Sequence, residues 1–305
     1  MYNGLINVYK EPGYTSFDVV AVLRGILKQK KIGHTGTLDP DAEGVLLVCL
    51  GNATRLCDML EDRSKAYRCR MLLGTCTDTE DTSGKVLSQA DWDSVTEEAI
   101  RRTAESFVGG YDQVPPMYSA LKVNGRKLYE YARAGIEVER KPRPIEISSI
   151  EIEKIELPYV TFTVSCGKGT YVRSLCRDIG EKLGCGACME HLTRVRVSHF
   201  MVEDSLKLSD FEKIMANGEM DRFVLPVESV FADSPAITAR EHAKKWIDNG
   251  NKLNVEDVEI TPEGKTPSDG CLYRTYNAEG KFVAVYRYSG EKMQFVPEKM
   301  FPGMD

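Results

Sequence analysis

Two different spacings of apolar residues near the start of the chain predict a helix and then a buried strand. Between residues 19 and 27 the apolar side chains recur every three or four positions, as on one face of an amphipathic helix. Thr15 or Ser16 can cap that helix, with Asp18 in its first turn. Residues 45–50 form an unbroken apolar run, which is typical of a buried strand.

Strand-like and helix-like patterns continue through the middle of the chain. Residues 65–74 alternate apolar and polar side chains, and residues 145–155 and 159–165 predict two strands around a polar turn. The spacing of apolar residues predicts helices over residues 96–107 and, after a glycine-rich turn, within 167–180.

The composition changes near residue 225, where a second domain is expected to begin. Residues 226–305 carry 13 acidic and 10 basic side chains, a net charge of −3, and glycine turns separate short strands. Such strands are expected over residues 270–276, 282–288 and 294–297. We interpret this region as a small β-rich domain whose interleaved basic residues are compatible with RNA binding.

The whole chain is mildly acidic, with 305 residues, 40 of them basic and 46 acidic, and a formal net charge of −6. This argues against a general nucleic-acid coat protein but not against an enzyme with a local basic surface. No apolar run is long enough to cross a membrane, and no signal peptide is evident. We expect a cytoplasmic protein without membrane contact, whose nine cysteines are reduced.

No sequence motif calls for a metal or a cofactor. Cys185 and Cys188 form a CxxC pair, but their neighbours lack zinc-site spacing, so we interpret both as buried structural thiols. The acidic loop at residues 77–84 lacks the ligand spacing of a calcium loop, and we expect it to be solvated. Phosphate-binding glycine motifs and serine-hydrolase signatures are also absent from the sequence.

Basic residues gather in one segment of this acidic chain. The basic segment, residues 122–143, has seven basic and three acidic side chains, a net charge of +4, with two tyrosines interleaved. It predicts a mobile arm for a polyanion, with Arg126, Lys127 and Arg133 as contacts. The alternative is a solvated helix and loop. The basic residues within 24–31 either complement a helix C-terminus or bind phosphate.

The most distinctive sequence is the loop at residues 33–44, directly before the buried strand. It holds three glycines, which permit turns that side chains forbid, and Pro40, which restricts the chain after Asp39. A rigid loop against a core strand can hold a reactive carboxylate in place. Asp39 is therefore a candidate catalyst, although an aspartate before proline is often only a turn former.

Four stretches together resemble the TruB branch of the pseudouridine synthases. Residues 33–40, Gly-His-Thr-Gly-Thr-Leu-Asp-Pro, are similar to the catalytic loop of that family, and residues 65–68, Lys-Ala-Tyr-Arg, to its tyrosine strand. Residues 169–175, Gly-Thr-Tyr-Val-Arg-Ser-Leu, resemble its arginine motif, and residues 192–194, Leu-Thr-Arg, its last core motif. The resemblance covers nearly the whole chain, including a C-terminal segment similar to a PUA domain.

The resemblance implies an α+β fold, in which helices flank a mixed, largely antiparallel central sheet and a small β-rich PUA-like domain follows. The catalytic domain would occupy residues 1–225, with a basic RNA-gripping insertion at about 122–146, and the PUA-like RNA-binding domain residues 226–305. The implied reaction is isomerisation of uridine to pseudouridine at position 55, in the T-arm loop of tRNA, without cofactor or metal. The expected partner is the tRNA T stem-loop, bound by a monomer without a protein partner.

The resemblance also implies roles for individual residues. Asp39 would act on the ribose of a flipped-out uridine, either by attack on C1′ or through a glycal intermediate. Arg173 would keep Asp39 ionised and oriented, and Tyr67 would stack on the uracil and could serve in proton transfer. The supporting residues are His34 in the gap left by the flipped base, Tyr171 and Leu192 along the pocket, and Lys10 as a structural support.

The sequence departs from the family pattern at two positions, and two rival functions remain. The N-terminal motif has Glu11 where proline is usual and Phe17 where histidine is common. The rivals are an RNA chaperone that folds tRNA and a related synthase that acts on rRNA within a guide-RNA particle. Intact Asp39, Tyr67 and Arg173 favour an active enzyme, and a chain without long basic tails disfavours the particle.

Overall fold

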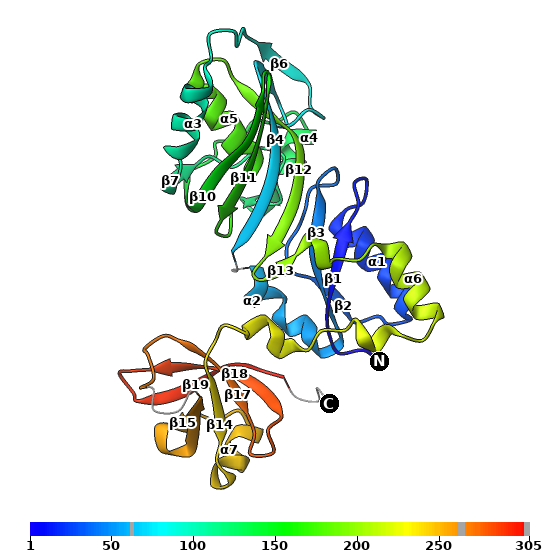
Figure 1. The fold of residues 1–305 in the computed structure, drawn as a ribbon, viewed down its shortest axis with the longest axis vertical. Coiled ribbons are helices and arrows are strands. Elements are labelled where there is room, and N and C mark those ends of the chain that lie inside the picture. Colours follow the sequence, from blue (N-terminus) through cyan, green and yellow to red (C-terminus); the bar gives the residue numbers. More distant parts are fainter. Residues whose placement is uncertain (62–63, 262–265, 302–305) are drawn as a thin grey trace.

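The molecule is elongated, with one sheet in each of two units (Figure 1). The structure is a computed structural model that describes residues 1–61, 64–261 and 266–301. Within these ranges a nine-stranded sheet forms the larger unit and a six-stranded sheet forms the C-terminal one. Two short hairpins accompany them, β5 (Thr75–Thr77) with β6 (Val86–Gln89) and β8 (Lys122–Val123) with β9 (Arg126–Lys127).

The large sheet is mixed and mostly antiparallel, as predicted. Its order is β1 (Gly4–Lys10), β3 (Glu43–Leu50), β12 (Ala187–Val197), β4 (Lys65–Leu73), β11 (Tyr159–Cys166), β10 (Arg143–Glu156) and β7 (Gly109–Gln113). β2 (Ile32–His34) pairs with β3, and β13 (Phe200–Met201) with β12. The one parallel contact among these strands joins β3 to β12 over two residue pairs, where the two halves of the sheet meet.

Helices cover each half of this sheet (Figure 1). α1 (Ser16–Leu27) and α6 (Leu208–Ala216) share an apolar cluster with β1 and β3. α3 (Glu97–Glu105) and α5 (Val172–Leu183) cover the half built from β4, β11 and β10. The predicted start of α1 is confirmed: the Thr15 hydroxyl accepts the Asp18 N–H, and the Asp18 carboxylate accepts the Thr15 N–H.

The C-terminal unit has its own core but also shares an apolar contact with the larger unit. Its strands run in the order β15 (Leu253–Asn254), β19 (Gln294–Met300), β18 (Phe282–Ser289), β17 (Leu272–Tyr276), β14 (Ala236–Ala239) and β16 (Val258–Thr261), with α7 (Lys244–Asp248) beside them. Val230 and Phe231 lie in the 3-10 helix before this sheet, and they pack with Leu5, Val45 and Val285. The predicted boundary at residue 226 therefore falls at the start of a connector whose Val230 and Phe231 are buried in a cluster shared by both units.

The segment between β7 and β10 ends earlier than expected, because β10 begins at Arg143. After the β8–β9 hairpin comes α4 (Leu128–Arg133), and irregular chain follows to residue 142. Residues 143–146, which were expected to belong to the insertion, lie in β10 and pair with β7. Burial of the apolar Ile145 side chain in the core favours the strand at these residues.

The thiols match their interpretation from sequence. None of the nine cysteines, all of which lie within the described residues, forms a disulfide, and Cys185 and Cys188 are buried. Among the described residues, no group of three or more histidine, cysteine or acidic side chains is arranged to hold a metal ion. No helix in the same ranges is long and apolar enough to cross a membrane. One short helix, α2 (Cys57–Glu61), follows a 3-10 turn after β3.

Candidate active site

Lys10, at the end of β1, fixes the loop that carries Asp39. Its ammonium group is fully buried and donates to the carbonyl oxygens of Pro40, at 2.8 Å, and Ala42, at 2.6 Å. Burial lowers the pKa of Lys10 to about 8, against the opposing effect of nearby carboxylates, Asp41 first among them. Lys10 therefore lies beneath the loop and binds its backbone, and its role as a structural support stays a prediction.

The turn before α1 and the first residue of α1 hold the other side of the loop at residues 33–44, which carries Asp39. The Leu38 N–H donates to Ser16 Oγ at 2.9 Å, and the Gly13 N–H donates to the Pro40 carbonyl at 3.0 Å. The two departures from the family motif lie outside these contacts. Phe17 is 63% exposed, and Glu11 forms an ion pair with Lys207.

Arg194 fixes the junction between the loop and the sheet. Its side chain is buried, and it donates to the carbonyl oxygens of Val45, at 2.7 Å, and Gly36, at 3.3 Å. Gly44 has a φ of +101°, and a Cβ atom there would lie 2.3 Å from the Arg194 carbonyl oxygen. Only glycine therefore lets β3 approach β12 this closely. The sequence motif included Arg194, but nothing local revealed this role.

Arg173, in the first turn of α5, binds Asp39 through both carboxylate oxygens. Arg173 Nε lies 2.9 Å from Asp39 Oδ2, and one terminal nitrogen lies 3.2 Å from Oδ1. The remaining donors reach the carbonyl oxygens of Thr79 and Tyr118, both at 2.9 Å. The Arg173 side chain is only 6% exposed, whereas that of Asp39 is 42% exposed. A fixed guanidinium thus presents an accessible carboxylate.

The groups around Asp39 shift the pKa of its carboxyl in opposite directions. Burial raises the pKa of the Asp39 carboxyl, the Arg173 guanidinium lowers it, and Asp81 raises it again. Asp81 also lies 3.6 Å from Arg173, so one cation serves two carboxylates. Removing Arg173 would therefore leave two carboxylates without a shared counter-charge.

Tyr67 and Leu192, which were predicted to line the site, belong to one buried apolar cluster. Tyr67 lies on β4 between Val164 of β11 and Arg194 of β12, and it is 9% exposed. Burial raises the pKa of its phenol, although Arg194 opposes the rise, so the hydroxyl keeps its proton at neutral pH. Leu192 and Leu38 belong to the same buried cluster as Tyr67.

Tyr171 directly precedes α5, which carries Arg173, and His34 lies before Asp39 at the start of the same loop. Tyr171 is the N-cap residue of α5, and its backbone N–H and carbonyl both bind the side chain of Gln113, at 2.8 and 3.1 Å. His34 ends β2, and its Nδ1 accepts the Gly36 N–H at 3.4 Å.

The expectation that the acidic loop is solvated was wrong for Thr77 and Glu80, which are buried, whereas Thr82 and Ser83 are exposed. Glu80 is 8% exposed and binds Ser174 and Arg177 of α5, while Thr79 and Asp81 contact Arg173. Cations in the first turns of a helix oppose its dipole, and this loop supplies their counter-charges. The basic residues Lys168, Arg173 and Arg177, near the N-terminal end of this helix where cations are unfavourable, were the only sequence signal for such partners.

The cations of the basic segment form a surface cluster of their own. Arg126 pairs with Glu130 at 3.4 Å and lies over the ring of Tyr131. Lys127 and Arg133 both lie over the ring of Tyr129, at 5.4 and 5.3 Å from its centre. The interleaved tyrosines thus hold neighbouring cations in this structure.

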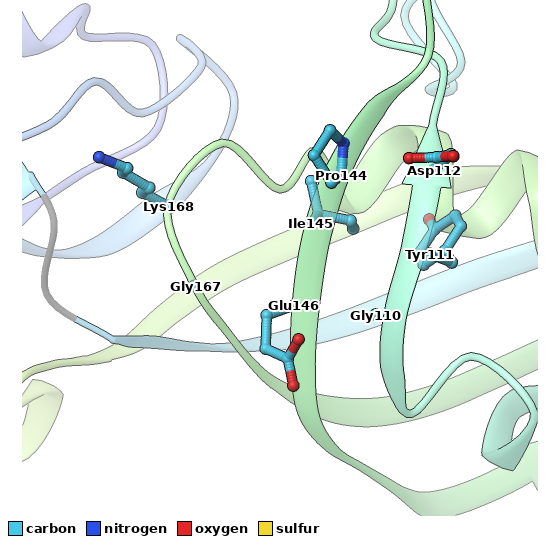
Figure 2. Close-up of a pocket in the computed structure, with 8 residues that line it drawn as sticks. All are labelled: Gly110, Tyr111, Asp112, Pro144, Ile145, Glu146, Gly167 and Lys168. Atoms are coloured by element: carbon cyan, nitrogen blue, oxygen red, sulfur yellow. The ribbon is translucent and has the colours of Figure 1, made fainter.

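A separate depression of about 700 Å³ lies at the edge of the large sheet (Figure 2). It is lined by parts of β7 and β10 and by Gly167 and Lys168, and the carboxylates of Asp112 and Glu146 give it acidic walls. None of the predicted site residues lines it. An acidic hollow of this kind does not suit a polyanionic ligand.

Comparison with family models decides the relationship of the chain. The model of the N-terminal domain of TruB family pseudouridylate synthases matches residues 24–172. The model of the C-terminal domain of tRNA pseudouridylate synthase B matches residues 173–232. The chain belongs to the TruB family. The family resemblance and the isomerase class inferred from the motifs are thus confirmed.

Curated relatives match this TruB-family chain over nearly its full length. The tRNA pseudouridine synthase B of Lachnoclostridium phytofermentans is 49% identical over 307 residues, covering 98% of this chain and 99% of its own. The protein of the same name from Clostridium tetani is 43% identical over 294 residues, covering 96% and 98%.

Solved structures confirm the fold class. A chain in an H/ACA ribonucleoprotein bound to a substrate RNA containing 2′-deoxyuridine is 27% identical, with a TM-score of 0.75, and the match covers 99% of this chain and 86% of that one. A chain in a Cbf5-Nop10-Gar1 complex is 28% identical with a TM-score of 0.74, covering 98% and 84%.

Proposed function

We propose that this TruB-family enzyme converts uridine to pseudouridine at position 55, in the T-arm loop of tRNA, with Asp39 as the essential carboxylate. The curated relatives are named for tRNA, which supports tRNA as the substrate. The observation that carries the catalytic assignment is the Asp39–Arg173 pair, in which a buried arginine holds a partly exposed carboxylate through two bonds.

The reaction rearranges one nucleoside without losing any atom. The N1–C1′ bond of uridine breaks, the uracil turns within the site, and a C5–C1′ bond forms. The C5 proton then leaves, and N1 is protonated. Asp39 would either attack C1′ or remove the 2′ proton to give a glycal, and Arg173 would keep it anionic for both routes. The buried wall of Tyr67 and Leu192 would hold the detached base.

Several other features fit a structured RNA substrate. A uridine inside a folded loop cannot reach Asp39 while stacked, so we propose that it is flipped out, with His34 filling the gap. Arg126 and Arg133, which are exposed, and Lys127, which is partly buried, would contact phosphates. The β-rich unit within residues 226–305 would add RNA contacts and allow an accessory tRNA-folding role. We propose that the enzyme acts as a monomer without a protein partner.

The decisive experiment uses Asp39→Asn and an unmodified tRNA transcript. Chemical mapping should find pseudouridine at position 55 with the wild-type protein, and the single-turnover rate of the variant should fall by at least about 10³-fold. Its dissociation constant for tRNA should stay within about twofold, because the phosphate contacts lie elsewhere. Asp112→Asn, at an exposed aspartate in the edge depression, is the matched control and should keep the wild-type rate.

Three outcomes would contradict the proposal. Substantial activity in Asp39→Asn would remove Asp39 from the mechanism. A product at another position would contradict the T-arm assignment. Binding of tRNA by the wild-type protein, with faster tRNA folding but no pseudouridine, would favour the chaperone instead.

A further inference from the structure

Glu80 is a buried carboxylate at which three separate parts of the chain meet. Its Oε2 accepts the Ser174 hydroxyl at 2.6 Å, and its Oε1 pairs with Arg177. Ser174 and Arg177 are three residues apart on α5, so one carboxylate binds two successive positions on the same face of the helix. A terminal nitrogen of Arg140, near the end of the basic segment, lies 4.0 Å from the same Oε1.

The backbone at Glu80 is held in an unusual conformation. Its φ is +63°, in the left-handed region that non-glycine residues rarely adopt. The Met189 N–H of β12 donates to the Glu80 carbonyl at 3.0 Å, and the Glu80 N–H donates to the Thr77 carbonyl at 3.3 Å. A turn that costs backbone strain and is bonded from two sides has one defined position.

The residues on either side of Glu80 are the ones that hold Arg173. Thr79 gives its carbonyl to the Arg173 guanidinium, and Asp81 places a carboxylate 3.6 Å from it. Any shift of Glu80 therefore moves two partners of the arginine that orients Asp39. No contact between Glu80 and Asp39 is needed for this effect.

The arginines that meet Glu80 also bind the connector between β7 and the basic segment. Arg177 donates to the Val114 carbonyl at 3.1 Å, and Arg140 donates to the Pro115 carbonyl at 3.0 Å. The same connector supplies the Tyr118 carbonyl that binds Arg173. Glu80 thus lies where the end of the basic segment, the connector and α5 join.

We propose that Glu80 is a positioning residue that couples the end of the basic segment, through Arg140, to the Arg173 that orients Asp39. The inference rests on the proposed function, since it takes Asp39 and Arg173 as the reacting centre. RNA bound to the basic segment would displace Arg140. Because Arg140 contacts Glu80, that displacement would shift Glu80 and its chain neighbours Thr79 and Asp81. The geometry of the Asp39–Arg173 pair would therefore depend on the position of the basic segment.

The test is Glu80→Gln, which keeps the shape of the side chain and removes its charge. At saturating tRNA the single-turnover rate should fall about 10- to 100-fold, as expected for misplacement of a catalytic group. The dissociation constant for tRNA should change less than threefold. Glu153→Gln, which breaks the surface ion pair with Arg68, is the control and should leave both quantities unchanged.

A pH profile separates positioning from a general loss of structure. Asp39 faces Arg173 from α5, Asp81 from the acidic loop and Lys10 from β1. If Glu80→Gln lets Arg173 drift from Asp39, the acidic limb of the rate profile should move to higher pH, because the carboxylate loses its counter-charge. A uniform loss of folded protein would lower the whole profile without moving that limb.

Arg140→Met is the second variant, because Arg140 lies nearer the surface than Glu80. It should lower the saturated rate, and the double variant with Glu80→Gln should be no slower than Glu80→Gln alone. A wild-type saturated rate in Glu80→Gln, an unmoved acidic limb, or strictly additive losses would each overturn the coupling. Activity in Asp39→Asn, measured in parallel, would instead overturn the proposed function beneath it.

Discussion

The loop that carries Asp39 and the basic segment are both proposed to present charged residues to RNA, but they are held in different ways. Buried groups hold the loop by its backbone: the Lys10 ammonium binds two of its carbonyl oxygens, and Ser16 binds Leu38. In the basic segment, Leu128 is the one buried residue of α4, and the cations Arg126, Lys127 and Arg133 lie over the rings of Tyr129 and Tyr131.

The difference reflects what each region has to do. Bond rearrangement at one carbon atom requires a carboxylate placed to a fraction of an ångström, so backbone and charge are both fixed. Attraction of a phosphate chain depends on the number of cations and tolerates adjustment of each one. Substitutions in the loop region should therefore change rate or stability, and substitutions in the segment should change affinity.

After Asp39→Asn, the largest effect is expected from Arg173→Lys. A lysine keeps the charge but cannot reach both oxygens of Asp39 and the carbonyls of Thr79 and Tyr118 together. The single-turnover rate should fall about 10²- to 10³-fold with little change in tRNA affinity. Arg196→Lys, at an arginine that binds Ser64 and Ser198, is the control. An equal loss of affinity would break the division between the two regions.

An intermediate effect is expected from Lys10→Met, and it should depend on pH. The pKa of Lys10 is about 8 in the folded protein and that of an ordinary lysine is 10.5, so between these values the unfolded chain binds more protons. Stability conferred by Lys10 must therefore rise with pH in this window.

Urea unfolding of both proteins at two pH values measures this linkage. Relative to Lys10→Met, the wild-type protein should gain about 2 kcal/mol of unfolding free energy between roughly pH 7.5 and 9.5. Lys30→Met, at an exposed lysine, should show no such gain. A pH-independent difference for Lys10→Met would mean that the buried ammonium group is not what fixes the loop.

The smallest effect should come from glutamine at Arg126, Lys127 and Arg133 together. Affinity for tRNA should fall by roughly tenfold at moderate salt, and each lost phosphate contact should lower the salt slope of the binding constant by about one. The rate at saturating tRNA and the unfolding free energy should stay close to wild type. An unchanged salt slope would assign these cations to the solvated surface that the sequence left as an alternative.

Local features were predictable because local chemistry decides them. The cap of α1 at Thr15, the buried strand after the loop and the burial of Cys185 and Cys188 follow from side-chain pattern and residue type. The motif around Asp39 identified the family. The exposure of the 77–84 loop was misjudged because acidic residues are usually solvated, and only a distant cation makes their burial favourable.

The sequence by itself determined the helix at α1, the main strands of the large sheet, the family and the candidate residues Asp39, Tyr67 and Arg173. The tertiary structure decided which groups support them. Arg173 and Asp39 are 134 positions apart, and Glu80 and Arg177 are 97 apart, so no local pattern records either pair. Such contacts exist only when the folded sheet brings buried charges together, because an isolated charge in a core is too costly to leave unpaired.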